Sequence, residues 1–96
     1  MTIKELINAC HETAKEKGFW DEPREFGTMV ALIHSELSEA LEADRHGDMD
    51  NVAEELADVL IRIFDMCGGV GIDLDGAVRK KMAKNMERPR LHGKQY

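Results

Sequence analysis

Apolar residues recur along this chain at the three- and four-residue spacing of amphipathic helices, and the pattern defines four segments. The first covers residues 2–17, the second 24–45, the third runs from 48 or 50 to about 68, and the fourth covers 73–88. Runs of β-branched and aromatic residues with a period of two are absent, so strands are not expected. The pattern predicts an all-α protein, a four-helix chain that forms an oligomeric helical bundle.

Residues that begin and end helices support these boundaries. Thr2 and Glu5 have the spacing of a capping box, and Gly18 follows the first helix as a stop. The stretch GGVGID, which starts at Gly68, is expected to end the third helix, and Asp73 to open the fourth.

One acid of the second helix lies in the wrong place for a solvent-exposed charge. At about 100° per residue, Glu36 falls within the apolar arc of this helix and Glu39 at its edge. That arc consists of Met29, Val30, Leu32, Ile33, Leu37, Ala40 and Leu41. A charge in a packed face costs several kcal/mol unless it is paired or binds a metal ion.

The third helix is apolar around most of its circumference. Its apolar residues cover roughly 220°, taking 100° per residue, and Ile61 and Phe64 are among them. Three other short helices cannot cover this surface and also bury their own arcs. We therefore expect an obligate homo-oligomer, a homodimer or a dimer of dimers. The remaining polar stripe carries Glu54, Glu55, Asp58, Arg62 and Asp65, and such a stripe on its own is usually a solvated face.

Two acid pairs favour a second interpretation over a solvated face, namely a metal site. Glu36 and Glu39 are three residues apart, as are Glu55 and Asp58, so each pair shares one helix face. An antiparallel hairpin of the second and third helices would bring both pairs to one pocket. Oxygen ligands suit Mg²⁺, with Mn²⁺ as a substitute. Carboxylate-bridged di-iron sites need Glu-x-x-His motifs, which the sequence lacks. Because Mg²⁺ keeps positions open for water and substrate phosphate, the four acids point to phosphate chemistry.

Composition narrows the function classes further. The 96 residues make one domain, 1–96, with 43% apolar and 33% charged residues, which is typical of globular proteins. A net charge of −6 argues against binding a nucleic acid polymer. No apolar run is long enough to cross a membrane or to serve as a signal peptide. Cys10 and Cys67 are isolated thiols, which favours a reducing, cytoplasmic location.

The acid pairs also carry a resemblance to a known family. Glu36-x-x-Glu39, fifteen intervening residues and Glu55-x-x-Asp58 resemble the ExxE…ExxD signature of the MazG-like all-α nucleoside triphosphate pyrophosphohydrolases. The wider superfamily includes dimeric dUTPases, dCTP pyrophosphatases and phosphoribosyl-ATP pyrophosphohydrolases. The resemblance extends over nearly the whole chain.

Two further segments resemble parts of this family. KKMAKNMERP is similar to its final helix, whose Lys and Asn, matching Lys81 and Asn85, face the nucleotide. His11 and Trp20 resemble the His and Trp that line the base pocket of dCTP-pyrophosphatase-like members. For both residues a structural role stays open: Trp20 as a core residue, His11 as a polar-face histidine.

The resemblance implies Mg²⁺-dependent hydrolysis of a (deoxy)nucleoside triphosphate to the monophosphate and pyrophosphate, with nucleotide-pool cleaning as the role. Metal ions on the four carboxylates would neutralise phosphate charge, with Glu36 and Glu39 as the catalytic acids and Glu39 activating water. The phosphates would be held by Lys81, with Arg88 or Lys94. Arg62 is a departure, because some relatives carry an aromatic residue there, near the sugar. Two alternatives remain: a phosphoribosyl-ATP pyrophosphohydrolase, and a non-catalytic helical dimerisation or adaptor module.

Overall fold

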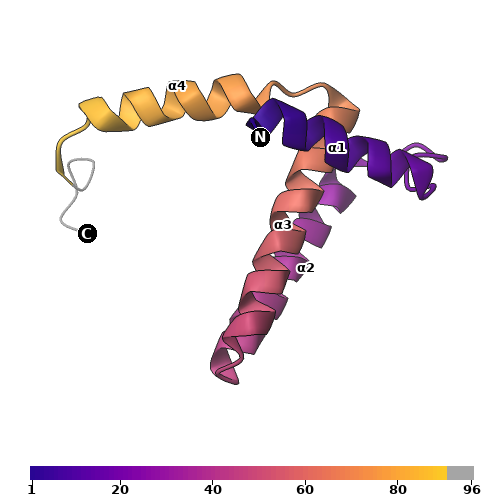
Figure 1. Cartoon of the computed structure of the whole chain (residues 1–96), viewed down its shortest axis with the longest axis horizontal. Helices are drawn as coiled ribbons and strands as arrows, with labels where there is room; N and C mark the ends of the chain where they lie inside the picture. Colours follow the sequence, from indigo (N-terminus) through magenta and orange to yellow (C-terminus); the bar gives the residue numbers. More distant parts are fainter. Residues whose placement is uncertain (91–96) are drawn as a thin grey trace.

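The computed structural model describes residues 1–90 and consists of four helices (Figure 1). They are α1 (Ile3–Glu16), α2 (Phe26–Arg45), α3 (Met49–Val70) and α4 (Leu74–Glu87). No strand occurs within the described residues. The all-α prediction is confirmed, and the helices begin and end within about two residues of the expected positions.

Side-chain caps fix three of the four helix starts. Thr2 and Glu5 form a reciprocal capping box at the start of α1. Asp48 accepts a hydrogen bond from the backbone N–H of Asn51 at the start of α3, and Asp73 caps α4 in the same way. These oxygens satisfy N–H groups that a helix leaves unpaired in its first turn.

The end of α3 differs from the expectation. The helix continues through Gly68 and Gly69 and ends at Gly71, which has the left-handed conformation (φ 78°). The two helical glycines leave room for neighbouring side chains. A Cβ on Gly68 would lie 2.8 Å from the Cβ of His11, and one on Gly69 would overlap the Trp20 ring. Gly68 and Gly69, which were expected to stop the helix, therefore lie within it and allow His11 and Trp20 to pack closely against α3.

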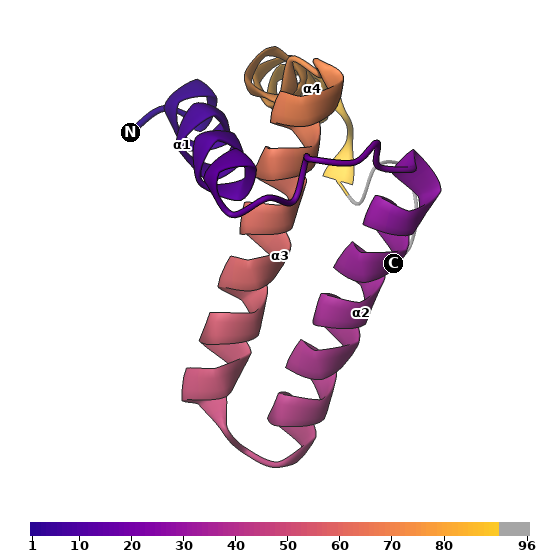
Figure 2. The same cartoon turned by 90° about the vertical axis from the view of Figure 1, so that its right-hand side faces the viewer.

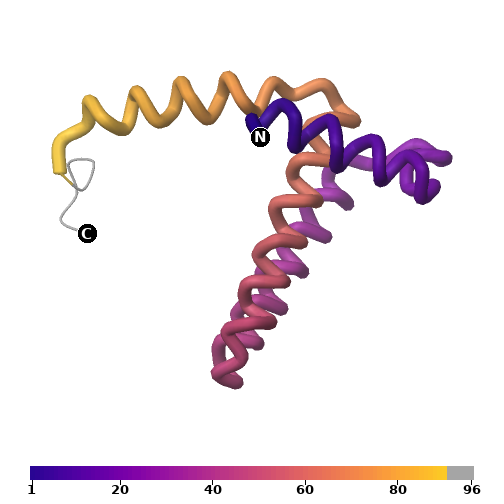
Figure 3. The backbone as a smooth tube through the Cα atoms, in the orientation of Figure 1, coloured from indigo at the N-terminus to yellow at the C-terminus, as the bar shows by residue number. Residues whose placement is uncertain are grey.

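The helices α2 and α3 form the expected antiparallel hairpin, and α1 lies across the part of α3 that is remote from the hairpin turn (Figure 2). The helix α4 leaves the end of α3 and extends away from the hairpin (Figure 1). The N-terminus lies beside the first turn of α4 (Figure 3), where the Lys4 backbone N–H donates to Asp75 Oδ2 at 3.1 Å. None of the described residues forms a helix long and apolar enough to span a membrane.

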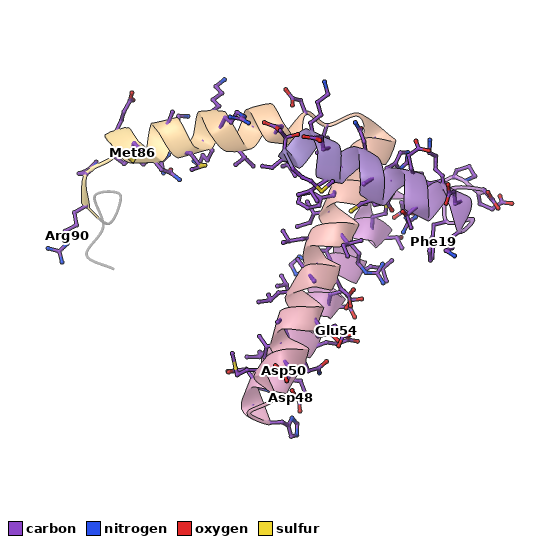
Figure 4. All side chains as sticks on the ribbon, in the orientation of Figure 1. Phe19, Asp48, Asp50, Glu54, Met86 and Arg90 are labelled. Atoms are coloured by element: carbon purple, nitrogen blue, oxygen red, sulfur yellow. The ribbon has the colours of Figure 1, made fainter. Side chains whose placement is uncertain are left out.

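Little of the apolar surface is buried within one chain. The buried apolar residues are Ile7, Met29, Ala40, Ala43, Val59, Met66 and Cys67. The helix α4 contributes no buried residue; Met86, near its end, is 86% exposed (Figure 4). The radius of gyration, 15.8 Å, exceeds the value of about 13 Å for a compact chain of this length.

The apolar arc expected on α2 divides into two faces. Met29 and Ala40 are buried, together with Ala43, whereas Leu37 and Leu41 are about half exposed. On α3, Leu56, Leu60 and Ile61 are also about half exposed, but Phe64 is partly buried. The alanines of α2 are therefore on its buried side, and the leucines of both helices leave apolar surface uncovered within one chain.

Candidate metal centre and its cavity

Three carboxylates gather where α2 and α3 face each other. Glu36 and Glu39 of α2 and Glu55 of α3 each place one oxygen within 4.8 Å of the others. The Glu36 side chain is 14% exposed, Glu55 is partly buried, and Glu39 is exposed. These three residues are called the acid cluster below.

The acid cluster has too few hydrogen-bond donors for its charge. The Glu36 carboxylate raises the pKa of Glu55 to about 7, because the protonated Glu55 can donate a hydrogen bond to it; Glu39 and burial act in the same direction. The same hydrogen bond lowers the pKa of Glu36, and Arg62 adds to this effect with its Nε 3.1 Å from Glu36 Oε1. One oxygen of Glu55, Oε2, is buried without a hydrogen-bond partner among the described residues.

Asp58 and Glu54 occupy different places relative to the acid cluster. Asp58 lies one turn further along α3 and is outside the group of three, although it lines the same cavity as Glu36. Glu54 is exposed, and Asp48 and Asp50 lie at the tip of the hairpin (Figure 4). The helix register therefore separates Glu55 from its neighbour Glu54, as expected for residues about 100° apart.

The donor set of the acid cluster fits a hard divalent cation. All available ligand atoms are carboxylate oxygens, which Mg²⁺ and Mn²⁺ prefer. An added cation would compensate the repulsion among the three acids and give the orphaned Glu55 oxygen a partner. Asp58, one turn further along α3, lies outside this group, so its role as a fourth ligand stays a prediction.

A cavity of about 460 Å³ extends between α1, α2 and α3. Glu36, Asp58 and Arg62 line one part of its wall, and Arg24 and Asp65 another. The remaining lining residues are Ala9, Cys10, Thr13, Ala14, Lys17, Phe19, Met29 and Ile61. A second hollow, of about 340 Å³, lies towards the hairpin turn and includes Glu39 and Glu55 in its wall. Both hollows meet the acid cluster, so it is accessible from two sides.

His11 and Trp20 meet at a residue that the sequence interpretation did not single out. Asp65 Oδ1 is 2.9 Å from His11 Nδ1 and accepts a hydrogen bond from Trp20 Nε1 at 2.8 Å. Arg24 Nη1 donates to Asp65 Oδ2 at 3.3 Å. The clue in the sequence was a single acid inside the apolar run of residues 63–67. Arg24 offered no such clue.

The His11 and Trp20 rings meet edge to face beside Asp65. The His11 and Trp20 ring centroids are 5.1 Å apart and nearly perpendicular, at 80°. The Arg24 guanidinium carbon lies 5.1 Å from the Trp20 centroid, over the ring. Among the described residues, Asp65 and Arg24 line the cavity, whereas His11 and Trp20 are not part of its lining. Base contacts by His11 and Trp20 stay a prediction.

The predicted phosphate-binding residues of α4 are not brought to the acid cluster within one chain. Lys81 and Asn85 are exposed on the helix that extends away from the hairpin (Figure 1). Arg88 follows α4 as its C-cap. Lys94 lies outside the described residues.

A family model described as the MazG nucleotide pyrophosphohydrolase domain matches residues 24–92. The chain belongs to this family. The match is shorter than the resemblance inferred from the sequence, because α1 and Trp20 precede it. It includes all four acids of the ExxE…ExxD pattern and also Asp65, so Asp65 joins the MazG domain to the segment before it. No curated protein and no solved structure matches the chain.

Proposed function

We propose that this MazG-domain protein hydrolyses (deoxy)nucleoside triphosphates in a Mg²⁺-dependent reaction. Water attacks the α-phosphorus, the bond to the β-phosphate oxygen breaks, and the products are the monophosphate and pyrophosphate. The observation that carries the proposal is the acid cluster, three carboxylates within 4.8 Å of one another beside a cavity of about 460 Å³. Membership of a nucleotide pyrophosphohydrolase family supports the reaction class.

Glu36, Glu39, Glu55 and Asp58 would hold Mg²⁺, with Mn²⁺ as a substitute. When bound, the cation neutralises phosphate charge and polarises the phosphorus that is attacked. Without it, a triphosphate would meet an acid cluster of the same charge sign, and repulsion would oppose binding.

Glu39 is the member of the acid cluster best placed to orient the attacking water and accept its proton. It is exposed, whereas Glu36 is almost covered and already pairs with Arg62. A general base must reach both solvent and the reacting atom. Glu36 contributes as a metal ligand and through Arg62, whose guanidinium lines the cavity and can contact the substrate.

We further propose that the working form is a homodimer or a dimer of dimers. The exposed leucines of α2 and α3 and the unburied helix α4 leave an apolar surface of the kind that marks interfaces. In such an assembly, Lys81 and Asn85 of a second copy would approach the nucleotide, with Arg88 or Lys94 near the phosphates. This supplies the cations that one chain does not bring to its own acid cluster.

Leu60→Glu tests the assembly, because Leu60 is 51% exposed in one chain and outside the cavity lining. The substitution should reduce the mass measured by light scattering and lower activity together. Glu16→Leu, a change on the exposed last turn of α1 and outside this apolar surface, serves as a check that surface substitution alone does not dissociate the protein. A fully active monomer of the unmodified chain would contradict the proposal.

The reaction itself is tested by measuring pyrophosphate release from the canonical ribo- and deoxynucleoside triphosphates with Mg²⁺ and with EDTA. We expect turnover that requires the cation and is lost in Glu36→Gln but kept in Glu54→Gln, which removes an adjacent charge outside the acid cluster. The physiological role would be cleaning of the cytoplasmic nucleotide pool. Absence of pyrophosphate from every nucleotide would refute the enzyme and favour a non-catalytic helical module.

A further inference from the structure

Asp65 is the charged residue that the described part of the chain buries most completely, with 8% of its surface exposed. A carboxylate in such a place is stable when several donors surround it. Its donors come from different parts of the chain: His11 from α1, and Trp20 and Arg24 from the connection to α2. Asp65 therefore fixes the position of the connection on α3.

The arrangement determines which chemical groups face the cavity. A carboxylate offers about four acceptor sites, and three donors already occupy Asp65. Arg24 has five N–H donors and gives one to Asp65. Its guanidinium is held from one side by Asp65 and from another by the Trp20 ring, and it lines the cavity. This part of the wall consequently offers more donors than acceptors.

A planar guanidinium makes its best contact with two neighbouring acceptor atoms. Guanine presents such a pair through N7 and O6, whereas adenine places an amino donor beside N7. Cytosine presents a pair through N3 and O2. Thymine and uracil carry an N–H between their carbonyl groups, so they offer single acceptors.

We propose that Asp65 is a positioning residue that presents the Arg24 guanidinium to the nucleobase, so that the cavity favours guanine or cytosine over adenine. The inference rests on the proposed function for the orientation of the nucleotide, with the phosphates at the acid cluster and the base towards Arg24. Arg24 makes the contact, and Asp65 acts through it. The Trp20 ring supports the guanidinium through a cation–π contact.

Two measurements on the full chain test the inference. The first compares kcat/KM for dGTP, dCTP, dTTP and dATP at saturating Mg²⁺. The better of dGTP and dCTP should exceed dATP by about ten-fold, the lower part of the range for a bidentate base contact. The second follows binding of deoxyguanosine, deoxycytidine and deoxyadenosine in EDTA through the fluorescence of Trp20, the single tryptophan of the chain. These nucleosides carry the base but no phosphate for the acid cluster to repel. The same order of affinity is expected.

The key variant is Arg24→Lys, which keeps the charge and the ion pair but loses the planar fork. It should reduce the ratio between the preferred base and adenine to within about two-fold, through KM rather than kcat. Asp65→Asn should reduce the same ratio and shift Trp20 emission in the free protein. Arg79→Lys, a matched change on exposed α4, should leave both readouts unchanged.

The outcomes separate the inference from the proposed function. If dATP is used as well as the other nucleotides, or if Arg24→Lys keeps the preference of the unmodified protein, the inference is wrong although hydrolysis stands. If no nucleotide is hydrolysed, the proposed reaction fails, and the fluorescence measurement still decides the base preference. Should Asp65→Asn not fold, Arg24→Lys alone decides.

Discussion

Two acids on α3 have opposite environments, although they are only ten positions apart in the sequence. Glu55 faces two other carboxylates, its pKa is raised to about 7, and one of its oxygens has no described partner. Asp65 is more deeply buried but is surrounded by three hydrogen-bond donors. Burial alone therefore does not distinguish the two sites; the supply of donors does.

The difference indicates what each site requires from outside the chain. Asp65 has its partners within the fold, so its charge is compensated without a ligand. In the free protein, the Glu55 carboxyl group either holds a proton or is repelled by the two neighbouring carboxylates. A site of the second kind gains from an added cation, which is why the acid cluster, rather than Asp65, is the candidate metal centre.

The largest expected effect comes from Glu55→Gln. Loss of a metal ligand should reduce kcat/KM by about 1,000-fold, corresponding to about 4 kcal/mol of transition-state stabilisation. In EDTA the same variant should be as stable as the unmodified protein or more so, because one charge leaves a repelling group. Pyrophosphate release and urea unfolding measure the two effects. Near-normal turnover would show that the metal site lies elsewhere.

Asp65→Ala should give the opposite result for stability. It leaves Arg24 and the Trp20 N–H without their partner, and we expect a loss of about 3 kcal/mol in the free energy of unfolding. Urea unfolding in EDTA measures it, with exposed Asp50→Ala as the control. A loss below about 1 kcal/mol would mean that the three donors find solvent or other partners at little cost.

Adding a divalent cation should stabilise the unmodified protein through the acid cluster. At 100 times the dissociation constant, MgCl₂ or MnCl₂ should add about 2.7 kcal/mol to the free energy of unfolding. Thermal unfolding measured over a titration of the metal should show this in Asp65→Asn as well, but not in Glu55→Gln. An equal shift in all three proteins would indicate a non-specific salt effect.

The smallest effect on stability is expected at Asp75, which accepts hydrogen bonds, as Asp65 does, but lies near the surface. Arg79 is the main cause that lowers the pKa of Asp75 from 3.8, and the Lys4 backbone N–H adds to it. A lowered pKa in the folded state means that the stabilisation is present above pH 3.8 and is lost as the pH falls below it. Asp75→Asn should therefore be slightly less stable than the unmodified protein at pH 7. The difference should decrease towards pH 3. A constant difference at all pH values would contradict this origin.

The sequence predicts the local structure well because local signals determine it. The caps at Thr2, Asp48 and Asp73 and the apolar spacing locate the helices. The spacing of Glu36 and Glu55 on a hairpin also brings three of the four predicted acids together. These inferences need only helix periodicity and the direction of neighbouring helices.

The remaining features depend on contacts between distant segments. Asp65 looked like one more acid of a polar stripe, because its partners are 41 to 54 residues away. Periodicity grouped Leu37 with buried Ala40, but it does not say which part of an apolar arc faces α3. Periodicity also does not predict the direction of α4, which extends away from the hairpin and places Lys81 far from the acid cluster.

The two glycines inside α3 have a consequence for sequence variation. In most helices, replacing glycine by alanine is favourable by roughly 0.5–1 kcal/mol, because the helix loses less backbone entropy on folding. At Gly69 the added methyl group would occupy space that the Trp20 ring already fills. In a mutational scan of this protein, alanine should therefore be selected against at position 69, contrary to its intrinsic helix preference. The indole would be forced away from Asp65, and the guanidinium that rests on it would lose its support.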